Sequence, residues 1–366
     1  SLGSRVNHAG VLVFHLIAQP VKHEFTPGLP AACWGYNGKT TGPTLEMFEG
    51  EPVRVYVPNR LPESTSVHWH GLVVKNGMDG VAGLTQPAIL PGETFRYDFT
   101  PKRAGTYMYH PHDDEMTQMA LGMMGMLVVH PKKPSHHVDK DFAIMLSAWR
   151  MKAGTARPDP LAMSDFNVLT MNSKVFPSID PLVVKRGERV RIRFGNLSAM
   201  DHHPIHIHGT QFAMTSTDGG AVPESAQFPQ TTILVPTGTT RDIEFTYDEN
   251  GDWPLHCHMT HHAMTQMGHD VENLVGVDVK GVDAHSMIMG DTGMAEMMAM
   301  GMPQPANIVA MVATKGPFGP ISMGGLFTVI KVRDVVDDDT ATSFYRHPAG
   351  TVARKATKAE LDEDLG

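Results

Sequence analysis

The chain has 366 residues, 41% of them hydrophobic and 19% charged, which is typical of a folded protein large enough for two or three domains. Its 30 Lys and Arg against 39 Asp and Glu give a net charge of −9, so the composition offers no basic footprint for nucleic acid. The longest nearly uncharged apolar stretch, residues 120–129, is about half of a membrane span, so we expect a soluble protein without a membrane partner.

Short segments that alternate apolar and polar residues recur along the chain. In order, they lie at 51–61, 93–100, 105–110, 126–131, 188–196, 241–248 and 326–334, and they are bounded by Gly, Pro or Asn. Alternation with a period of two predicts β-strands, and long helical periodicity is scarce. Many short strands with frequent turns predict an all-β fold built from β-sandwiches or barrels.

The sequence also contains an internal repeat. Residues 43–71 resemble residues 181–209, and residues 88–112 resemble residues 233–258. Two copies of one β-domain explain this similarity, and we place domain 1 at 10–135 and domain 2 at 140–282. Residues 283–366 show no third copy. There we predict a C-terminal extension with a Met-rich stretch over 283–323, a strand at 326–334 and a polar tail.

Metal-binding residue types are abundant, since the chain has 21 His, 26 Met and 2 Cys. Imidazole and thioether suit late transition metals such as copper. Four His-x-His pairs occupy equivalent places in the two repeats, and on a strand both histidines of a pair point to the same face. One such pair is more often an accident than a site. Four in register predict eight metal-binding imidazoles, at His68, His70, His110, His112, His206, His208, His256 and His258.

The last pair in domain 2 belongs to a richer motif, HCHMTHHAMTQM over residues 256–267. Cys257 is followed by His262 at a spacing of five and by Met267 at a spacing of ten, and His203 is a further candidate imidazole. Two His, one Cys thiolate and a weak axial Met form the ligand set of a blue-copper electron-transfer site. The alternative is an ordinary buried thiol, which is our expectation for the other cysteine, Cys33.

The motifs HWHGL, HPHDDE, HPIHIHG and HCHMTHHAMTQM resemble the four copper signatures of the multicopper oxidases. The resemblance covers nearly residues 40–280 and implies two tandem cupredoxin-like Greek-key domains that hold four coppers per chain. It assigns type 1 copper to His203, Cys257, His262 and Met267, and type 2 copper to His68 and His206. It assigns the type 3 pair to His70, His110, His112, His208, His256 and His258.

Domain 1 departs from the ligand pattern of domain 2. Pro111 stands where domain 2 has Cys257, and Met116 stands where it has His262, so we expect no type 1 copper in domain 1. Asp79, in a Gly-flanked turn, resembles an acidic position that relays protons in the family, although a turn-forming Asp is the alternative. Relatives often carry a carboxylate where Ala263 follows His262. The acids Asp113, Asp114 and Glu115 are candidates to replace it, and a solvated acidic turn is the alternative.

The resemblance implies a laccase-like oxidase in which Cys257 passes electrons from a phenolic or metal-ion reductant to a cluster that reduces O₂ to water. One alternative is a cuprous oxidase or copper-tolerance protein that uses the Met-rich stretch, whose methionines otherwise only pack on the domain. A weaker alternative is a copper nitrite reductase, which needs fewer histidines. With only two domains, the resemblance implies a homotrimer with clusters shared between subunits, periplasmic or extracellular after loss of a signal peptide.

Overall fold

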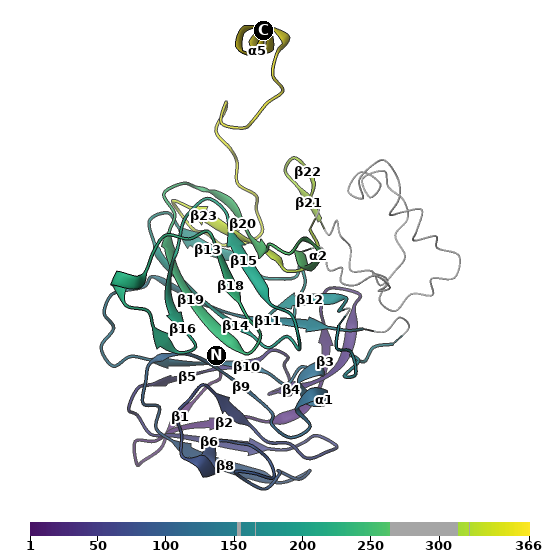
Figure 1. Cartoon of the computed structure of the whole chain (residues 1–366), viewed down its shortest axis with the longest axis vertical. Helices are drawn as coiled ribbons and strands as arrows, with labels where there is room; N and C mark the ends of the chain where they lie inside the picture. Colours follow the sequence, from purple (N-terminus) through teal and green to yellow (C-terminus); the bar gives the residue numbers. More distant parts are fainter. Residues whose placement is uncertain (152–154, 165, 264–313, 322) are drawn as a thin grey trace.

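The computed structural model describes residues 1–151, 155–164, 166–263, 314–321 and 323–366. Met267 and nearly all of the predicted Met-rich stretch lie outside these described residues. Strands dominate, and they form two β-sandwiches stacked end to end (Figure 1). None of the helices in the described part of the chain is long and apolar enough to cross a lipid bilayer.

The first sandwich joins two four-stranded sheets around one core. One sheet has the order β1 (Arg5–Val6), β2 (Leu12–His15), β6 (Val53–Pro58), β8 (Thr94–Phe99). The other has the order β5 (Gly42–Phe48), β10 (Gly125–His130), β9 (Gly105–His110), β7 (His68–His70). Alternate residues of β6 are buried, as its sequence pattern predicts, and they pack against Leu45, Tyr109 and Leu127 of the opposite sheet.

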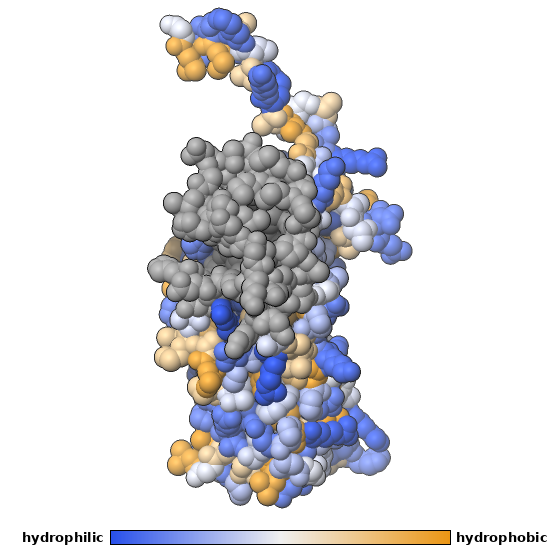
Figure 2. All heavy atoms as spheres, turned by 90° about the vertical axis from the view of Figure 1, so that its right-hand side faces the viewer, coloured by the Kyte–Doolittle hydropathy of each residue, from blue (hydrophilic) through white to orange (hydrophobic). Residues whose placement is uncertain are grey.

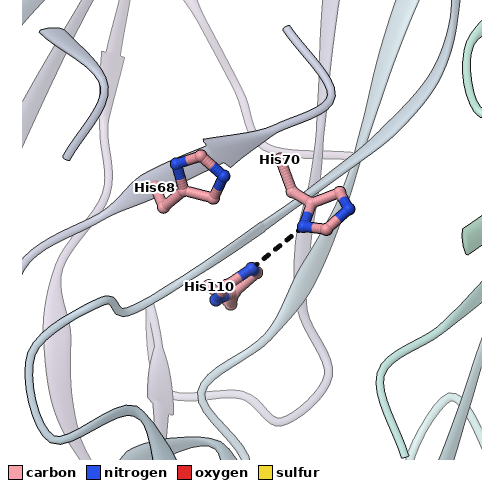
Figure 3. Close-up of side chains that lie close together, drawn as sticks. All are labelled: His68, His70 and His110. Carbon is pink, nitrogen blue, oxygen red and sulfur yellow. Dashed lines mark hydrogen bonds between the residues drawn. The ribbon is translucent and has the colours of Figure 1, made fainter. Parts of the chain in front are cut away.

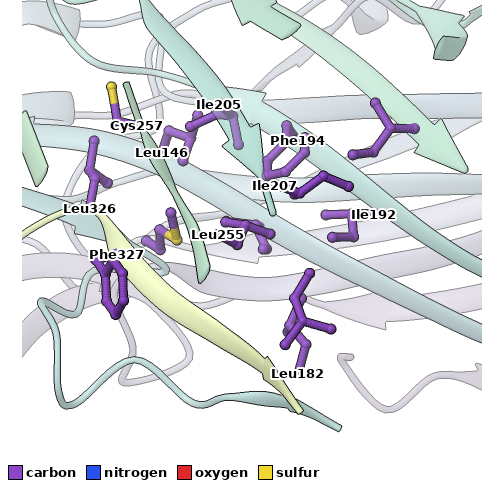
Figure 4. Packing of buried hydrophobic residues seen from close by; sticks show 14 of the residues in the cluster. Leu146, Leu182, Ile192, Phe194, Ile205, Ile207, Leu255, Cys257, Leu326 and Phe327 are labelled. Atoms are coloured by element: carbon purple, nitrogen blue, oxygen red, sulfur yellow. The ribbon is translucent and has the colours of Figure 1, made fainter. Parts of the chain in front are cut away.

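The second sandwich repeats this plan with larger sheets. One has the order β12 (Val168–Met171), β11 (Lys140–Trp149), β14 (Arg189–Asn196), β19 (Thr239–Thr246), β16 (Ala213–Thr217), β17 (Gly220–Ala221). The other has the order β13 (Leu182–Lys185), β23 (Phe327–Arg333), β20 (Gly251–Cys257), β15 (His203–Ile207), β18 (Thr232–Val235). Branched and aromatic side chains from both sheets, such as Ile192, Phe194, Ile205 and Leu255, fill the space between them (Figure 4).

The terminal strand does not belong to the separate extension predicted for residues 283–366. The strand at 326–334 forms, but as β23 it lies between β13 and β20 of the second sandwich. It pairs in parallel with β13, as β10 pairs in parallel with β5 in the first sandwich. The strand is therefore a repeat element separated from the rest of its domain by residues 258–326, and domain 2 does not end at residue 282.

The two domains share a well-packed boundary. A hairpin of domain 1, β3 (Ala18–Glu24) and β4 (Pro30–Tyr36), packs Phe25 and Cys33 against Trp149 of domain 2. Gly195 on β14 has no side chain at the point where the sulfur atoms of Met108 and Met126 approach, and a Cβ there would lie 2.6 Å from Met126 Sδ. This fit holds the domains in one fixed arrangement.

A buried polar group adds specificity to the same boundary. Strand alternation turns Arg193 away from the domain 2 core, and its guanidinium donates to Thr106 Oγ1 of domain 1 at 2.7 Å and pairs with both carboxylate oxygens of Asp141. Thr106 in turn donates to Asp242 Oδ2 at 2.9 Å. Charged groups this deeply buried require such partners, so the polar cluster fixes how the domains dock.

Beyond β23 the chain leaves the body as an arm. Residues 346–366 are almost entirely exposed, and the arm ends in α5 (Lys358–Leu365), which Thr357 and Glu360 close with a reciprocal capping box. Figures 1 and 2 show this arm projecting beyond the second sandwich. It contributes nothing to the histidine sites described next.

Candidate metal centres

Four domain 1 histidines converge on one face of the sheet formed by β7 and β9. His68 lies directly opposite His110 in this antiparallel pair, so the two His-x-His motifs face each other across the ladder. The ring centroid of His68 lies 5.4–5.7 Å from those of His70, His110 and His112. His70 Nδ1 and His110 Nε2 approach to 3.2 Å (Figure 3). The structure therefore groups all four residues as the sequence predicts.

Domain 2 repeats this arrangement on β15 and β20. His206 lies opposite His256 in the ladder, and the ring of His206 lies 4.7–5.6 Å from those of His208, His256 and His258. His208 Nε2 and His256 Nε2 are 3.1 Å apart. The same cross-strand geometry thus produces a second group of four imidazoles.

Backbone carbonyls orient the rings in the two groups in equivalent ways. In domain 1, Nδ1–H of His68 donates to the Asp79 carbonyl at 2.8 Å, and Nδ1–H of His110 donates to the Pro111 carbonyl at 2.9 Å. In domain 2 the donors are His206 and His256, and the acceptors are the carbonyls of Thr231 and Cys257. Because Nδ1 carries the proton in each of these rings, Nε2 is the nitrogen whose electron pair can bind a metal.

A third group, buried in domain 2, contains three residues that could hold one metal ion. His203 is on β15, Cys257 ends β20 and His262 lies in α2 (Thr260–Ala263). Cys257 Sγ is 3.5 Å from His262 Nδ1 and 3.8 Å from His203 Nδ1, and the two nitrogens are 3.1 Å apart. Three ligands about 2.1 Å from one ion in a trigonal plane lie about 3.6 Å apart, so this donor set fits one copper ion.

Burial shifts the pKa values of several of these candidate ligands. Loss of hydration lowers the pKa of His203 and of His110 to about 3 and that of His262 to about 4, so all three are neutral ligands at pH 7. Burial also raises the pKa of Cys257 to about 12. The Cys257 thiolate therefore needs a cation beside it, and metal binding must release the thiol proton.

Ser198 is a site residue that sequence reasoning missed. Its Oγ lies 2.9 Å from His203 Nε2, and both side chains are buried. A hydrogen bond on Nε2 leaves Nδ1 of His203 to face Cys257 and fixes the plane of the ring. Ser198 lies five residues before His203, in the loop after β14, and a single Ser in a loop carries no sequence signal for this role.

Two acids approach the domain 1 histidines. Asp79 Oδ1 lies 3.6 Å from His68 Nδ1, in addition to the backbone contact described above. Glu115, at the start of α1 (Glu115–Ala120), places its carboxylate oxygens 3.6 Å from His110 Nδ1 and 3.6 Å from His112 Nε2. Of the three acids considered at 113–115, Glu115 is the one that this geometry brings to the imidazoles.

The described residues do not bring the two four-histidine groups into one site. All four domain 1 histidines open onto a cavity of about 750 Å³ between the domains. The domain 2 residues that line this cavity include Leu197, Ser198 and Thr237 but none of His206, His208, His256 and His258. Among the described residues, the eight histidines therefore form two separate groups of four.

Comparison with known proteins identifies the family. Two family profiles described as multicopper oxidase match residues 18–134 and 152–276. The chain belongs to the multicopper oxidase family. The matched regions contain all three histidine-bearing groups and the Cys257 motif. The family binds copper, and its members are oxidoreductases that use O₂ and a reductant.

Individual relatives agree with this assignment. Copper resistance protein A of Escherichia coli is 28% identical over 232 residues, which is 50% of this chain and 38% of that protein. The chain thus spans about two fifths of the length of that relative. Among solved structures, the blue copper oxidase from Nitrosomonas europaea is 25% identical with a TM-score of 0.66, over 91% of both chains. The multicopper oxidase mgLAC is 27% identical with a TM-score of 0.66, over 90% of this chain and 93% of that one. These two structures confirm the predicted cupredoxin-like fold.

Proposed function

We propose that this multicopper oxidase is laccase-like and couples one-electron oxidation of a phenolic or metal-ion reductant to reduction of O₂ to water. The observation that carries the proposal is the buried trio of His203, Cys257 and His262, whose donor atoms lie 3.1–3.8 Å apart. Cys257 is bonded through the backbone to His256 and His258, which belong to the second group of imidazoles. One short covalent path therefore links the two kinds of site.

Copper at these sites would supply one-electron transfer at the Cys257 trio and O₂ reduction at the eight histidines. The chain contributes ligand geometry, because β15, β20 and the β23 backbone hold the trio rigidly. Cys257 N–H donates to the Leu326 carbonyl at 3.0 Å, and Leu326 N–H donates to the His262 carbonyl at 3.1 Å. Met267, which lies outside the described residues, would be the fourth ligand of copper at the trio, and each chain would hold four coppers. Asp79, whose carboxylate lies beside His68, would orient water at the cluster or relay protons to the oxygen that is reduced there.

We further propose that the eight-histidine cluster forms between subunits of a homotrimer. The separation of the two histidine groups supports this assembly, because the domain 1 group faces a cavity that none of the described domain 2 histidines of the same chain lines. A contact of domain 1 with domain 2 of the next chain is heterologous and must close into a ring to avoid a filament. Three subunits would give three clusters and three Cys257 sites.

Mixing two inactive variants tests this assembly. His110→Ala removes a ligand from the domain 1 half, and His256→Ala removes one from the domain 2 half. Mixed trimers contain some interfaces with two intact halves, so we expect partial return of O₂ consumption after the variants are unfolded and refolded together. Each variant refolded alone is the control. No rescue in trimers verified as mixed, or full activity of a monomer in sedimentation, would refute the shared site.

A second candidate is a cuprous oxidase or copper-tolerance function, favoured by the relative named copper resistance protein A and by the Met-rich sequence. O₂ consumption with Cu(I), Mn(II), Fe(II) and a phenol, with and without residues 285–311, separates the candidates. A copper nitrite reductase is disfavoured because it needs one three-histidine copper rather than two groups of four. We propose a periplasmic or extracellular location, which suits copper handling and oxidation of external reductants.

A further inference from the structure

The last strand and the residues after it fix the direction in which the C-terminal arm leaves domain 2. Asp252 on β20 pairs with Arg333 at 2.6 Å and accepts a hydrogen bond from the Tyr345 backbone N–H at 2.8 Å. Lys331 Nζ donates to the Ser343 carbonyl at 2.7 Å. These contacts anchor the chain as far as residue 345, and the arm beyond it points away from domain 1 along the long axis of the molecule (Figures 1 and 2).

The helix at the end of this arm gains little stability from its own chain. α5 has eight residues, and isolated helices shorter than about 12 residues are marginal in water. Its last turn contains Asp362, Glu363 and Asp364 but no basic residue, so its charge opposes the helix dipole. Leu361 and Leu365 lie one turn apart on the same side and are 47% and 81% exposed. A partner with an apolar spot and positive charge would therefore stabilise α5.

Domain 1 carries a group of exposed cations, which we call the basic patch. They lie on the loops at 101–104 and 131–134, and they are Lys102, Arg103, Lys132 and Lys133. The two loops meet at Gly50, whose N–H donates to the Pro101 carbonyl at 2.7 Å and where a Cβ would lie 3.1 Å from Lys132 Nζ. Within the described part of the chain, these four cations form no ion pair, and they outnumber the neighbouring acids Glu49 and Glu51.

An exposed aromatic side chain lies beside the basic patch. Phe48 is 46% exposed and ends β5, two residues before Gly50 and opposite His130 of β10. The ring centroids of Phe48 and His130 are 5.5 Å apart. Packing among the described residues leaves nearly half of Phe48 in water, and the two leucines of α5 match it as apolar groups. The surface thus offers both features that α5 lacks in its own chain.

We propose that α5 docks on the basic patch of a second copy of the chain, with its leucines against Phe48 and with Glu363 and Asp364 beside the cations. The observations favour a second copy, because the arm points away from domain 1 of its own chain (Figure 1). In the proposed homotrimer, domain 1 of one chain already meets domain 2 of another, and the arm leaves from domain 2. The inference rests on the proposed function only for this arrangement of the copies.

Cross-linking between chains of different mass tests the contact. Full-length chains in which p-benzoylphenylalanine replaces Leu365 are refolded with copper together with isotopically heavy, unmodified chains and then irradiated. We expect links to heavy peptides that contain Phe48, Lys102 or Lys132, in the proportion of heavy chains in the mixture. The same label in place of Val335, which is 76% exposed before the arm begins, should not reach the basic patch. No link, links only to light peptides, or links away from the basic patch would overturn the proposal.

Reversal of charge tests the electrostatic part of the contact. E363K/D364K on the arm, or K102E/K132E on the basic patch, should raise the concentration at which the oligomer dissociates in sedimentation by about tenfold. The combination of both pairs should restore most of the affinity, because the charges are exchanged but still attract each other. D338K/D339K reverses two adjacent exposed acids before the arm and should behave as the parent does. An unchanged dissociation in both reversed variants, or no recovery in their combination, would contradict the docking of α5.

The same samples separate this inference from the proposed function. Links between chains from residue 365, without rescue in the mixture of the His110→Ala and His256→Ala variants, would contradict the shared cluster and support the arm contact. Rescue of O₂ consumption in trimers that form no such link would contradict only the arm contact. Links together with normal assembly but no O₂ consumption in the copper-loaded parent would contradict the proposed oxidase and leave the arm contact intact.

Discussion

The two domains carry different side chains at equivalent positions of the same β-sandwich fold. In domain 2 these positions hold His203, Cys257 and His262 with their donor atoms turned toward each other. The repeat aligns Thr65, Pro111 and Met116 with these ligands. In domain 1 the Thr65 hydroxyl donates to Gln118 Oε1 at 2.7 Å, and Gln118 Nε2 donates to the Ser64 carbonyl at 2.7 Å.

The difference shows how a β-sandwich can keep its shape after a metal site is replaced. Thr65 and Gln118 are fully buried, so their hydrogen bonds satisfy polar groups that would otherwise be stranded. Met116, the counterpart of His262, points outward and is 61% exposed, whereas His262 is 3% exposed. One domain fills the position with a closed hydrogen-bond cluster, and the other leaves donor atoms available for copper.

The largest expected effect follows from removal of the thiolate in domain 2. Cys257→Ser should abolish the blue absorption and O₂ consumption, because hydroxyl oxygen does not replace thiolate donation to the type 1 copper. The cluster histidines remain, so most of the copper should stay bound. Absorption spectra and copper analysis measure the two quantities. Cys33→Ser changes the other buried cysteine and should leave the colour unchanged. A blue Cys257→Ser protein would contradict the assignment.

The buried histidines predict an acid dependence of the copper-free protein. In the unfolded chain they bind protons near pH 6.5, but burial lowers the folded-state pKa of His203 to about 3. The free energy of unfolding should therefore fall as pH decreases from about 6.5 to 4, by about 1.4 kcal/mol per pH unit for each such group. Urea unfolding at several pH values gives the slope. His203→Leu should flatten it by one such increment, whereas a slope equal to that of the parent would exclude this cause. The exposed His137→Leu is the control.

Domain 1 should be sensitive to loss of its hydrogen-bond cluster. Gln118→Ala removes the partner of the buried Thr65 hydroxyl and of the half-buried Ser64 carbonyl, which should lower the free energy of unfolding by about 2–4 kcal/mol. Denaturant titration measures the change, and Gln211→Ala, at an exposed side chain, should cost less than about 1 kcal/mol. Similar losses in both variants would show that the cluster is not what replaces the metal in domain 1.

The smallest effect should come from Asp79→Asn. The variant keeps the backbone carbonyl that orients His68 but neutralises the carboxylate 3.6 Å from His68 Nδ1. We expect turnover to fall about tenfold and its pH profile to shift, with copper content unchanged. Steady-state O₂ consumption across pH measures this. Asp334→Asn, at a surface ion pair with Arg186, is the control. An unchanged profile would remove the proton-transfer role.

The sequence by itself determined the strands, the repeat and which candidate ligands share a face of a strand. These features are local, because a period of two fixes which side chains share a face, and a His-x-His pair on a strand therefore acts as a unit. The contrast between Cys257 and Pro111 likewise needs only the alignment of the two repeats. Asp79, proposed from the family resemblance and from its place in a Gly-flanked turn, has its carboxylate 3.6 Å from His68 Nδ1, and its role stays a prediction.

Only the tertiary structure decided the features that depend on contacts between distant segments. The pairing of β23 with β13 and β20 places residues 327–333 in domain 2, although residues 258–326 separate them from β20. The choice of Glu115 among three acids and the contact of Ser198 with His203 have the same origin. Strand periodicity carries no information about such contacts, because packing of the two sandwiches sets which loops meet. For the same reason, only the folded chain shows that the cavity lined by the four domain 1 histidines is not lined by the domain 2 group.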